Sequence, residues 1–341
     1  RNKHGNGAKF KNIKGIFMKY ILAFIFVVAV ALGGAFLYFY SQVRFDAYTI
    51  IDYKPKLATQ IFDRNNELIA NIFEENRIYV KYNDIPPRVI EALVAIEDTS
   101  YFEHGGINVE AMARAAIKDI KARKLVEGAS TLTQQLIKNL ALSREKKFTR
   151  KIKEVVLAMK LESELSKEDI IERYLNHVYF GHGYYGIKTA AEGYFRKELN
   201  ELSIKEIAML VGMPKAPSTY DPTKHLDLSL SRANRVLERM YSIGWINEDE
   251  YRKGVLEEPA VFDDTLTQNK APYIVDEVLK EASKRFEDIK TGGYVIETSV
   301  DLKVQDMASE ALKYGYNEIL KRNKDANASI LNGAIVVTLP K

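Results

Sequence analysis

The chain has 341 residues, which is enough for one large domain with accessories or for two modest domains. Its net charge of +4 is small for this length, so bulk charge gives no argument for nucleic acid and no such partner is expected. The absence of cysteine excludes disulfides, thiolate zinc sites and a cysteine nucleophile. Because the chain begins at Arg1 and ends in the strand-like run AIVVTL, we expect a fragment of a longer protein.

An uncharged apolar run of 21 residues extends from Tyr20 to Tyr40. About 20 apolar residues suffice for a helix to span the hydrocarbon core of a membrane. The residues before this run include basic and no acidic side chains, which predicts a cytoplasmic tail over 1–19 and a transmembrane anchor over 20–41. A cleaved signal peptide is the first alternative, but the small-x-small pattern at Ala29–Ala31 lies inside the run. A buried soluble helix is the second, and its flanks are rarely so unequal in charge.

After the anchor, residues 48–86 change to a β pattern. Short apolar runs at Ala58–Phe62 and Leu68–Phe73 surround the turn-rich Asp63–Asn66. We predict a small hairpin on a juxtamembrane stalk.

From residue 87 to 257 the apolar period is helical, so the predicted fold class is mainly α. One helix is expected to begin after Pro86 and Pro87, and another to end at Pro214. Further periodic runs centre on the residues Met112 to Ile120, Ile152 to Leu161 and Ile170 to Val178. The segment is interpreted as one domain of ordinary size.

Residues 258–341 are mixed. Helical patterns near Tyr273–Phe286 and Val304–Leu320 flank a strand-like Gly293–Thr298. We predict an α/β linker that leads into a further domain, of which only the beginning is present.

The first cluster of chemically informative residues is Glu97–Gly106, with sequence EDTSYFEHGG. A carboxylate that ends an apolar helix beside aromatic rings can exchange protons near neutral pH. The alternative is a solvated helix end followed by a glycine turn.

The second cluster is Gly128–Asn139, with sequence GASTLTQQLIKN. Thr131 and Gln134 have the spacing of a capping box, which is a purely structural role. That role leaves Gln135 and Lys138 unexplained. They lie three residues apart near a helix start, where backbone donors and a lysine suit an anionic ligand.

The third cluster is Arg150–Glu154, with sequence RKIKE. Arg150 and Glu154 have the spacing of an ordinary surface ion pair, worth a few tenths of a kcal/mol. The alternative is a phosphate clamp beside a carboxylate, since arginine holds phosphate oxygens in a bidentate fork.

The fourth cluster runs from Glu172 to Gly186 and is rich in aromatic residues and glycine. This composition suits a helix end beneath a carbohydrate cleft, and core packing explains most of it equally well. His104, His177 and His182 do not have the spacing of a metal site.

In this order the blocks resemble the family 51 glycosyltransferase (peptidoglycan transglycosylase) domain of class A bifunctional penicillin-binding proteins. The matching blocks end with an apolar helix, Ala208 to Pro214, and the resemblance spans about Tyr48 to Glu257. Two departures are mild: Tyr101 replaces the usual Phe and Asn108 replaces a common Asp.

The resemblance implies a lysozyme-like, mainly α fold that polymerises lipid II into β-1,4 glycan strands and releases polyprenyl pyrophosphate. It assigns Glu97 as general base on the sugar 4-hydroxyl and Glu154 as the carboxylate that assists the leaving pyrophosphate. A divalent cation, Mg²⁺ or Mn²⁺, is optional at Glu154 and none is obligatory. The implied substrate-binding residues are Lys138, Arg150, Lys151, Ser130, Thr131, Gln134, Gln135, Asn139, His104 and Asp98.

The resemblance also implies partners and a location. The partners are lipid II, the growing lipid-linked strand, the membrane and other proteins of cell-wall synthesis. The location is the inner (plasma) membrane, with one pass, a cytoplasmic N-terminus and the catalytic domain outside.

Three strings imitate a penicillin-sensitive transpeptidase: Ser143–Lys146, Tyr174–Asn176 and Lys290–Gly292. The first two lie among the glycosyltransferase blocks and the third precedes a strand that leads to that domain, so we expect no transpeptidase activity. Two further functions stay open. A lytic transglycosylase or lysozyme cleaves strands and has no need of cations around a pyrophosphate, and a non-enzymatic scaffold has no need of Glu97 or Glu154.

Overall fold

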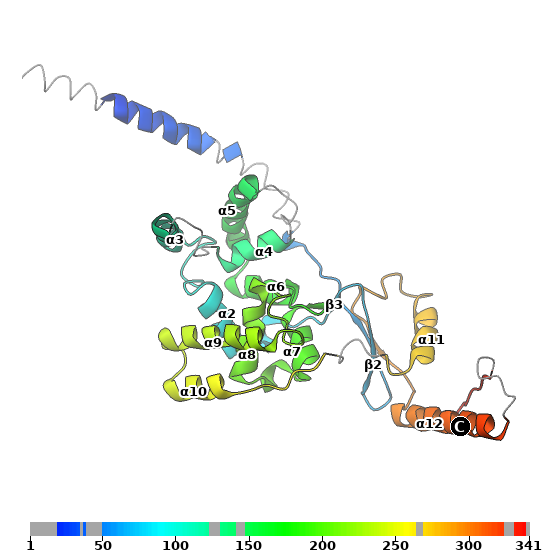
Figure 1. The fold of residues 1–341 in the computed structure, drawn as a ribbon. Helices are drawn as coiled ribbons and strands as arrows, with labels where there is room; N and C mark the ends of the chain where they lie inside the picture. The colour runs from blue at the N-terminus through cyan, green and yellow to red at the C-terminus, as the bar shows by residue number, and fades with distance from the viewer. Residues whose placement is uncertain are drawn as a thin grey trace, which may run out of the picture. The chain divides into compact units, whose positions relative to one another are not determined.

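The computed structural model describes residues 19–34, 37–38, 50–122, 130–140, 147–263, 269–323 and 331–338. The described chain is mainly helical, as the sequence predicts (Figure 1). It divides into two compact units, the first made of Arg1–Tyr53 and Phe102–Ile170 and the second of Lys54–Tyr101 and Ile171–Lys341.

The predicted transmembrane anchor, residues 20–41, falls partly on described residues. A helix covers residues 19–34, whereas 35–36, 39–41 and positions 1–18 of the predicted basic tail lie outside the described residues. Within the described ranges, no helix combines the length and the apolar character needed to cross a membrane. The anchor therefore stays a prediction.

Helices make up the first unit beyond residue 102. They are α3 (Val109–Ala122), α4 (Leu132–Leu140), α5 (Lys147–Glu164) and the beginning of α6 (Lys167–His177). Helix α4 packs against α5. The predicted capping box at the start of α4 is confirmed: Thr131 N–H donates to Gln134 Oε1 over 3.1 Å, and Gln134 N–H donates to Thr131 Oγ1 over 3.2 Å.

The second unit has a helical core in which α2, α8 and α9 pack against one another. Its helices and helical turns before residue 264 are η1 (Tyr82–Asp84), α2 (Pro87–Glu97), α7 (Ile187–Phe195), η2 (Leu199–Glu201), α8 (Ile204–Gly212), η3 (Met213–Lys215), α9 (Leu226–Ser242) and α10 (Glu248–Leu256). Helix α2 begins at Pro87 as predicted. Helix α8 starts with a capping box of Ser203 and Glu206 and ends two residues before Pro214, close to the predicted position.

Several second-unit elements are not among the individual helices and strands predicted from the sequence, although α7, α9 and α10 lie within the range 87–257 that is predicted to be helical. Helices α7, α9 and α10 are among them, and so is a short parallel pair of β3 (Asn76–Arg77) with β4 (Tyr184–Tyr185). The buried Arg77 secures this pair, because its guanidinium donates to the carbonyls of Asn176 and Lys56.

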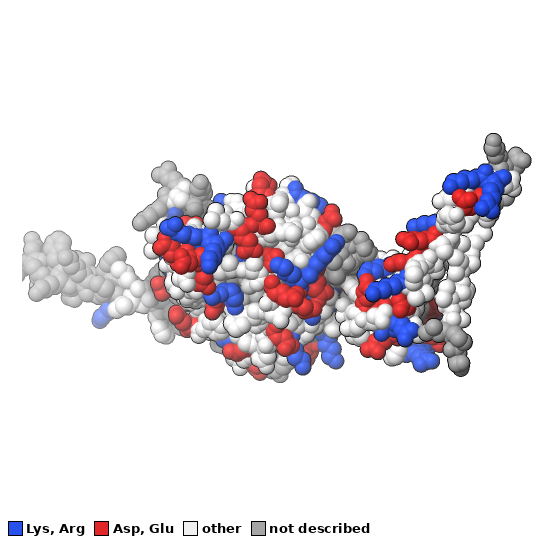
Figure 2. Space-filling model, turned by 90° about the horizontal axis from the view of Figure 1, so that it is seen from below, with Lys and Arg blue, Asp and Glu red and all other residues white. Residues whose placement is uncertain are grey.

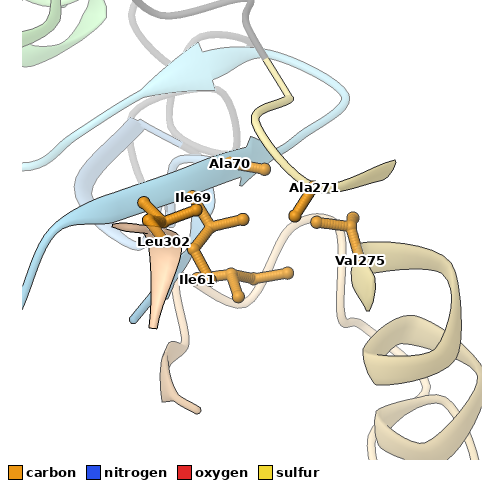
Figure 3. Close-up of a cluster of buried hydrophobic side chains, with 6 residues drawn as sticks. All are labelled: Ile61, Ile69, Ala70, Ala271, Val275 and Leu302. Atoms are coloured by element: carbon orange, nitrogen blue, oxygen red, sulfur yellow. The ribbon is translucent and has the colours of Figure 1, made fainter. Parts of the chain in front are cut away.

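The predicted hairpin is confirmed as antiparallel β1 (Thr59–Phe62) and β2 (Leu68–Ile72). It does not stand alone. Strand β5 (Val295–Glu297) pairs with β1 in parallel, which gives the sheet order β2-β1-β5. The side chains buried over this sheet come from two segments far apart in the sequence (Figure 3), and they are Ile61, Ile69, Ala70, Ala271, Val275 and Leu302.

The two helices predicted near the C-terminal end are also present, as α11 (Pro272–Ala282) and α12 (Leu302–Arg322). The strand predicted between them is β5. On the face seen in Figure 2, basic and acidic side chains are interspersed and neither sign forms a broad field. This mixture agrees with the small net charge of the sequence.

Candidate active site

Glu97 is the last residue of α2, in the second unit. Its side chain is 14% exposed and lies 3.6 Å from the Arg232 guanidinium, measured from Glu97 Oε1 to Arg232 Nη2. The following residue, Asp98, is buried, and its carbonyl accepts the Tyr101 N–H in a tight turn. The first predicted block therefore presents a nearly buried carboxylate beside a cation.

Two arginines of α9 reach the last turn of α2, and sequence reasoning missed both. Arg232 donates from Nε to the Gly212 carbonyl over 3.2 Å, which fixes the guanidinium that faces Glu97. Arg239 donates from Nε to the Ala95 carbonyl and from Nη2 to the Thr99 hydroxyl. The seven-residue spacing of these arginines places them on one helix face, which is the only signal the sequence offers.

Tyr174 of α6 is fully buried in the same unit. Burial raises the pKa of its hydroxyl, and the negative charge of Glu97 raises it further. This hydroxyl therefore stays protonated at physiological pH, and in this form it is a hydrogen-bond donor.

The described part of the second predicted block, residues 130–139, leads into α4 and makes up most of that helix in the first unit, while 128–129 lie outside the described residues. The Thr131 hydroxyl donates to the Gly106 carbonyl over 2.7 Å, which ties the start of α4 to the end of the first block. Gln134 is buried, and its Nε2 has no hydrogen-bond partner among the described residues. Gln135 is half-buried, while Lys138 and Asn139 are exposed on the last turns of the helix. An unpartnered buried amide donor marks a place where a polar ligand group gains a bond.

The third predicted block surrounds Glu154 with cations on α5. Arg150 Nε donates to Glu154 Oε1 and Lys151 Nζ to Glu154 Oε2, each over 3.1 Å. Lys151 also donates to Ser130 Oγ over 2.9 Å. The Glu154 side chain is 5% exposed, against 24% for Arg150 and 45% for Lys151. Two cations thus stand at the surface over a buried carboxylate, and only one of their charges is neutralised locally.

The third block has features of both interpretations, the ion pair and the phosphate clamp. The predicted ion pair between Arg150 and Glu154 is confirmed. Because Lys151 shares the same carboxylate, the cluster keeps a net positive charge that a simple surface pair would lack. An excess of cations at a partly open surface favours binding of an anion such as a phosphate.

His104 lies in the first unit, where its backbone carbonyl accepts a hydrogen bond from Lys167 Nζ over 2.6 Å. The structure joins the predicted residues near α4 and α5 into two hydrogen-bonded sets. Thr131 bonds to Gln134, and Lys151 bonds to both Ser130 and Glu154. Glu97 and Asp98 belong to the second unit.

The donors around Glu154 do not favour a metal ion. Each carboxylate oxygen already faces a cationic nitrogen, and no group of three His, Asp, Glu or Cys side chains within the described ranges could hold a metal ion. An optional Mg²⁺ or Mn²⁺ at Glu154 stays a prediction.

The fourth block is mainly structural where it is described. The Asn176 side-chain amide donates to the Val80 carbonyl and accepts the Val80 N–H, so this transpeptidase-like asparagine is occupied in holding the fold. Gly186 has φ of +82°, and a Cβ there would lie 3.0 Å from the Asn176 carbonyl oxygen. Of the two remaining imitating strings, 143–146 lies outside the described residues and Lys290–Gly292 precedes β5.

Comparisons with known proteins identify the family of the chain. The family described as Transglycosylase matches residues 65–241, which is more than half of the chain. Penicillin-binding protein 1F of Bacillus subtilis (strain 168) is 38% identical over 304 residues, covering 86% of this chain and 42% of that protein. Penicillin-binding protein 1A of Escherichia coli (strain K12) is 36% identical, covering 87% and 36% respectively.

Among solved structures, a crystal structure of penicillin-binding protein 1A from Haemophilus influenzae is 27% identical. It covers 79% of this chain and 30% of its own, with a TM-score of 0.44. The chain thus spans less than half the length of these relatives. The family match includes the blocks at Glu97, Thr131, Glu154 and Asn176. The chain belongs to the transglycosylase family.

Proposed function

We propose that the chain is a peptidoglycan glycosyltransferase that polymerises lipid II into β-1,4 glycan strands with inversion. The observation that carries the proposal is the family match across residues 65–241, which includes both Glu97 and the cation cluster at Glu154. The names of the relatives support it, since both are penicillin-binding proteins. The lysozyme-like fold belongs to the same proposal and is supported by the mainly helical architecture.

In the proposed reaction, the 4-hydroxyl oxygen of the acceptor sugar attacks the anomeric carbon of the lipid-linked donor. Glu97 takes the hydroxyl proton as the new C–O bond forms. The bond from the anomeric carbon to the pyrophosphate oxygen breaks, and the pyrophosphate keeps the electron pair of that bond. Because it leaves from the face opposite the attacking hydroxyl, the configuration of the anomeric carbon is inverted. The position of Glu97 beside Arg232 supports this role, because the guanidinium 3.6 Å away helps to orient the carboxylate.

The charge that develops on the leaving pyrophosphate needs stabilising cations. We assign this task to Arg150, Lys151 and Lys138, with Glu154 holding the first two in place. Ser130, Thr131, Gln134, Gln135, Asn139, His104 and Asp98 complete the proposed substrate-binding set. The unpartnered Nε2 of Gln134 supports the placement of a polar substrate group beside α4.

We propose that residues 20–41 anchor the protein once in the inner (plasma) membrane, with 1–19 in the cytoplasm and the catalytic part outside. The uncharged run and the basic residues before it support this topology. A cysteine-free chain permits a direct test. A membrane-impermeant maleimide should label Asp227→Cys in intact spheroplasts and Lys3→Cys only after lysis. Labelling of both before lysis would contradict the topology.

We further propose the division of the chain at 48–86, 87–257 and 258–341 as stalk, glycosyltransferase domain and linker with the start of a transpeptidase domain. The match over 65–241 supports the middle segment. Pairing of β1 with β5 means that the first and last segments share one small sheet.

The deciding experiment is polymerisation of purified lipid II, followed on gels that resolve glycan strands. Wild type should make strands, and Glu97→Gln should make none, because the amide cannot take the proton. Glu91→Gln is the matched control, since Glu91 lies on the same helix and forms a half-exposed ion pair with Arg88. It should polymerise like wild type.

A strand-cleaving enzyme and a scaffold predict different results from the same gels. A lytic enzyme would shorten pre-formed strands and make none. A scaffold would do neither, and Glu97→Gln would then behave like wild type in every assay. Either outcome would overturn the proposal.

A further inference from the structure

A buried ion pair in the first unit adjoins the proposed substrate-binding residues and takes no part in the proposed reaction. Glu162, near the end of α5, and Lys167, the first residue of α6, approach to 2.5 Å between Oε2 and Nζ. The Glu162 side chain is 5% exposed and that of Lys167 is 20% exposed. This pair is therefore largely withdrawn from water.

Each member of the pair makes a second bond to a different segment. The other Glu162 oxygen, Oε1, accepts the hydroxyl of Thr133. Lys167 Nζ donates to the backbone carbonyl of His104 over 2.6 Å. The pair thus links the α5–α6 junction to α4 on one side and to the turn at His104, near the end of the first block, on the other.

The two linked segments are those that carry proposed substrate-binding groups. Thr133 is fully buried and lies between Thr131 and Gln134 at the start of α4. The turn that contains His104 continues to Gly106, whose carbonyl accepts the Thr131 hydroxyl. A closed chain of bonds therefore runs from α4 through Glu162 and Lys167 to His104, and from Gly106 back to α4.

Burying an ion pair is costly, and apolar residues of similar volume often stabilise a fold equally well or better. Stability alone thus gives little reason for a charged pair here. Apolar residues could not replace the directional hydrogen bonds of the pair. The Lys167 ammonium donates to the His104 carbonyl, and the Glu162 carboxylate accepts from the Thr133 hydroxyl.

We propose that Glu162 and Lys167 are positioning residues. They hold the His104 turn and the first turn of α4 in the relative position that substrate binding requires. The proposal rests on the proposed function, because the groups held in place are those assigned to lipid II. It predicts that loss of the pair raises the KM for lipid II more than it lowers kcat, since substrate contacts rather than the base are displaced.

The test compares Lys167→Met with Lys167→Arg and Lys160→Met in lipid II polymerisation, at a temperature well below each thermal midpoint. Lys167→Met should lower kcat/KM roughly ten- to hundredfold, as small displacements of positioned groups do. Lys167→Arg keeps donors for both Glu162 and His104 and should restore most of the loss. Lys160→Met removes a partly exposed ion pair with Glu164 on the same helix, so it should match wild type.

Thr133→Val provides a second variant that keeps both charges and nearly the same shape. It removes only the hydroxyl that donates to Glu162. A raised KM in this variant would therefore support the positioning role, because the buried charges are unchanged. The inference fails if Lys167→Met and Thr133→Val both stay within twofold of wild type in KM. It also fails if the arginine variant is as impaired as the methionine variant. Failure of the proposed function is distinct, since wild type would then make no strands in the same assay.

Discussion

Arg232 sets the immediate surroundings of Glu97. Its guanidinium lies 3.6 Å from one carboxylate oxygen and is held by the Gly212 carbonyl at 3.2 Å. Glycine at 212 is required for this approach, because a Cβ there would lie 2.9 Å from Arg232 Cγ. The backbone of α8 therefore fixes the cation that faces the proposed base.

Arg232→Met should lower kcat for strand formation by roughly tenfold or more, because Glu97 loses the charge that orients its carboxylate. Initial rates with saturating lipid II measure the change. Arg235→Met, an exposed arginine on the same helix, serves as control and should leave the rate unchanged. Equal rates for the two variants would show that the ion pair does not contribute.

Glu192 on α7 titrates in the physiological range. Burial raises its pKa from 4.5 to about 7, and Glu198 adds to the rise while Lys188 opposes it. Its side chain is 20% exposed. The folded state thus binds more protons than the unfolded state between these two values, so its contribution to stability falls as pH rises through about 7.

Glu192→Gln removes this dependence, because the amide carries no charge at any pH. At pH 8 the variant should exceed wild type in unfolding free energy by up to roughly 3 kcal/mol, and near pH 4 the two should agree. Denaturant unfolding across this pH range gives the comparison. A difference that stays constant with pH would contradict the assignment.

At the scale of elements, the approach of the turn at Gly106 to α5 depends on a missing side chain. Gly106 has φ of +92°, and a Cβ would lie 2.5 Å from the Ala158 carbonyl oxygen. The adjacent Gly105 has no such φ and no atom within 4 Å of its Cβ position.

Gly106→Ala should therefore destabilise the first unit by about 3 kcal/mol, through backbone strain and a clash with α5. Gly105→Ala should stay within about 0.5 kcal/mol of wild type. Thermal unfolding of the two variants side by side provides the measurement. Comparable stabilities would mean that the turn shifts away from α5 without cost.

Local patterns predicted the elements whose determinants lie close together in sequence. The capping box of Thr131 and Gln134 needs only four residues, and the strands of the hairpin alternate around one turn. The ion pair of Arg232 with Glu97 joins residues on two different helices, and α9 looks like an ordinary amphipathic helix in the sequence. The seven-residue spacing of Arg232 and Arg239 places them on one face of α9, but it does not identify Glu97 as a partner.

At the scale of the whole molecule, strand β5 depends on residues far away in the chain. Asp63 at the end of β1 is buried and accepts the backbone N–H of Leu302, which is 239 residues distant. The sequence predicted both β1 and β5 as strands but contained no signal for their pairing, because register across such a separation follows from the assembled core. The two segments are brought together by the small buried core shown in Figure 3, to which both contribute side chains.

Leu302→Ala should loosen the hairpin of β1 and β2, although the hairpin lies far away in the sequence. Leu302 is 3% exposed, and truncation of a buried leucine typically costs about 2–5 kcal/mol. Hydrogen exchange of the amides at Ile61 and Ala70 should accelerate, while amides of α8 should exchange as in wild type. Unchanged protection in the hairpin would show that α12 does not support it.

The parallel pairing of β1 with β5 also orders events in time. During synthesis, β1 leaves the ribosome more than 230 residues before β5. At about 5–20 residues per second, this interval lasts roughly 10–50 s. Throughout it, one edge of β1 has its backbone groups unpaired, and such an edge is a template for association with other chains. Until residues 295–297 arrive, this edge of the hairpin is therefore open to such association.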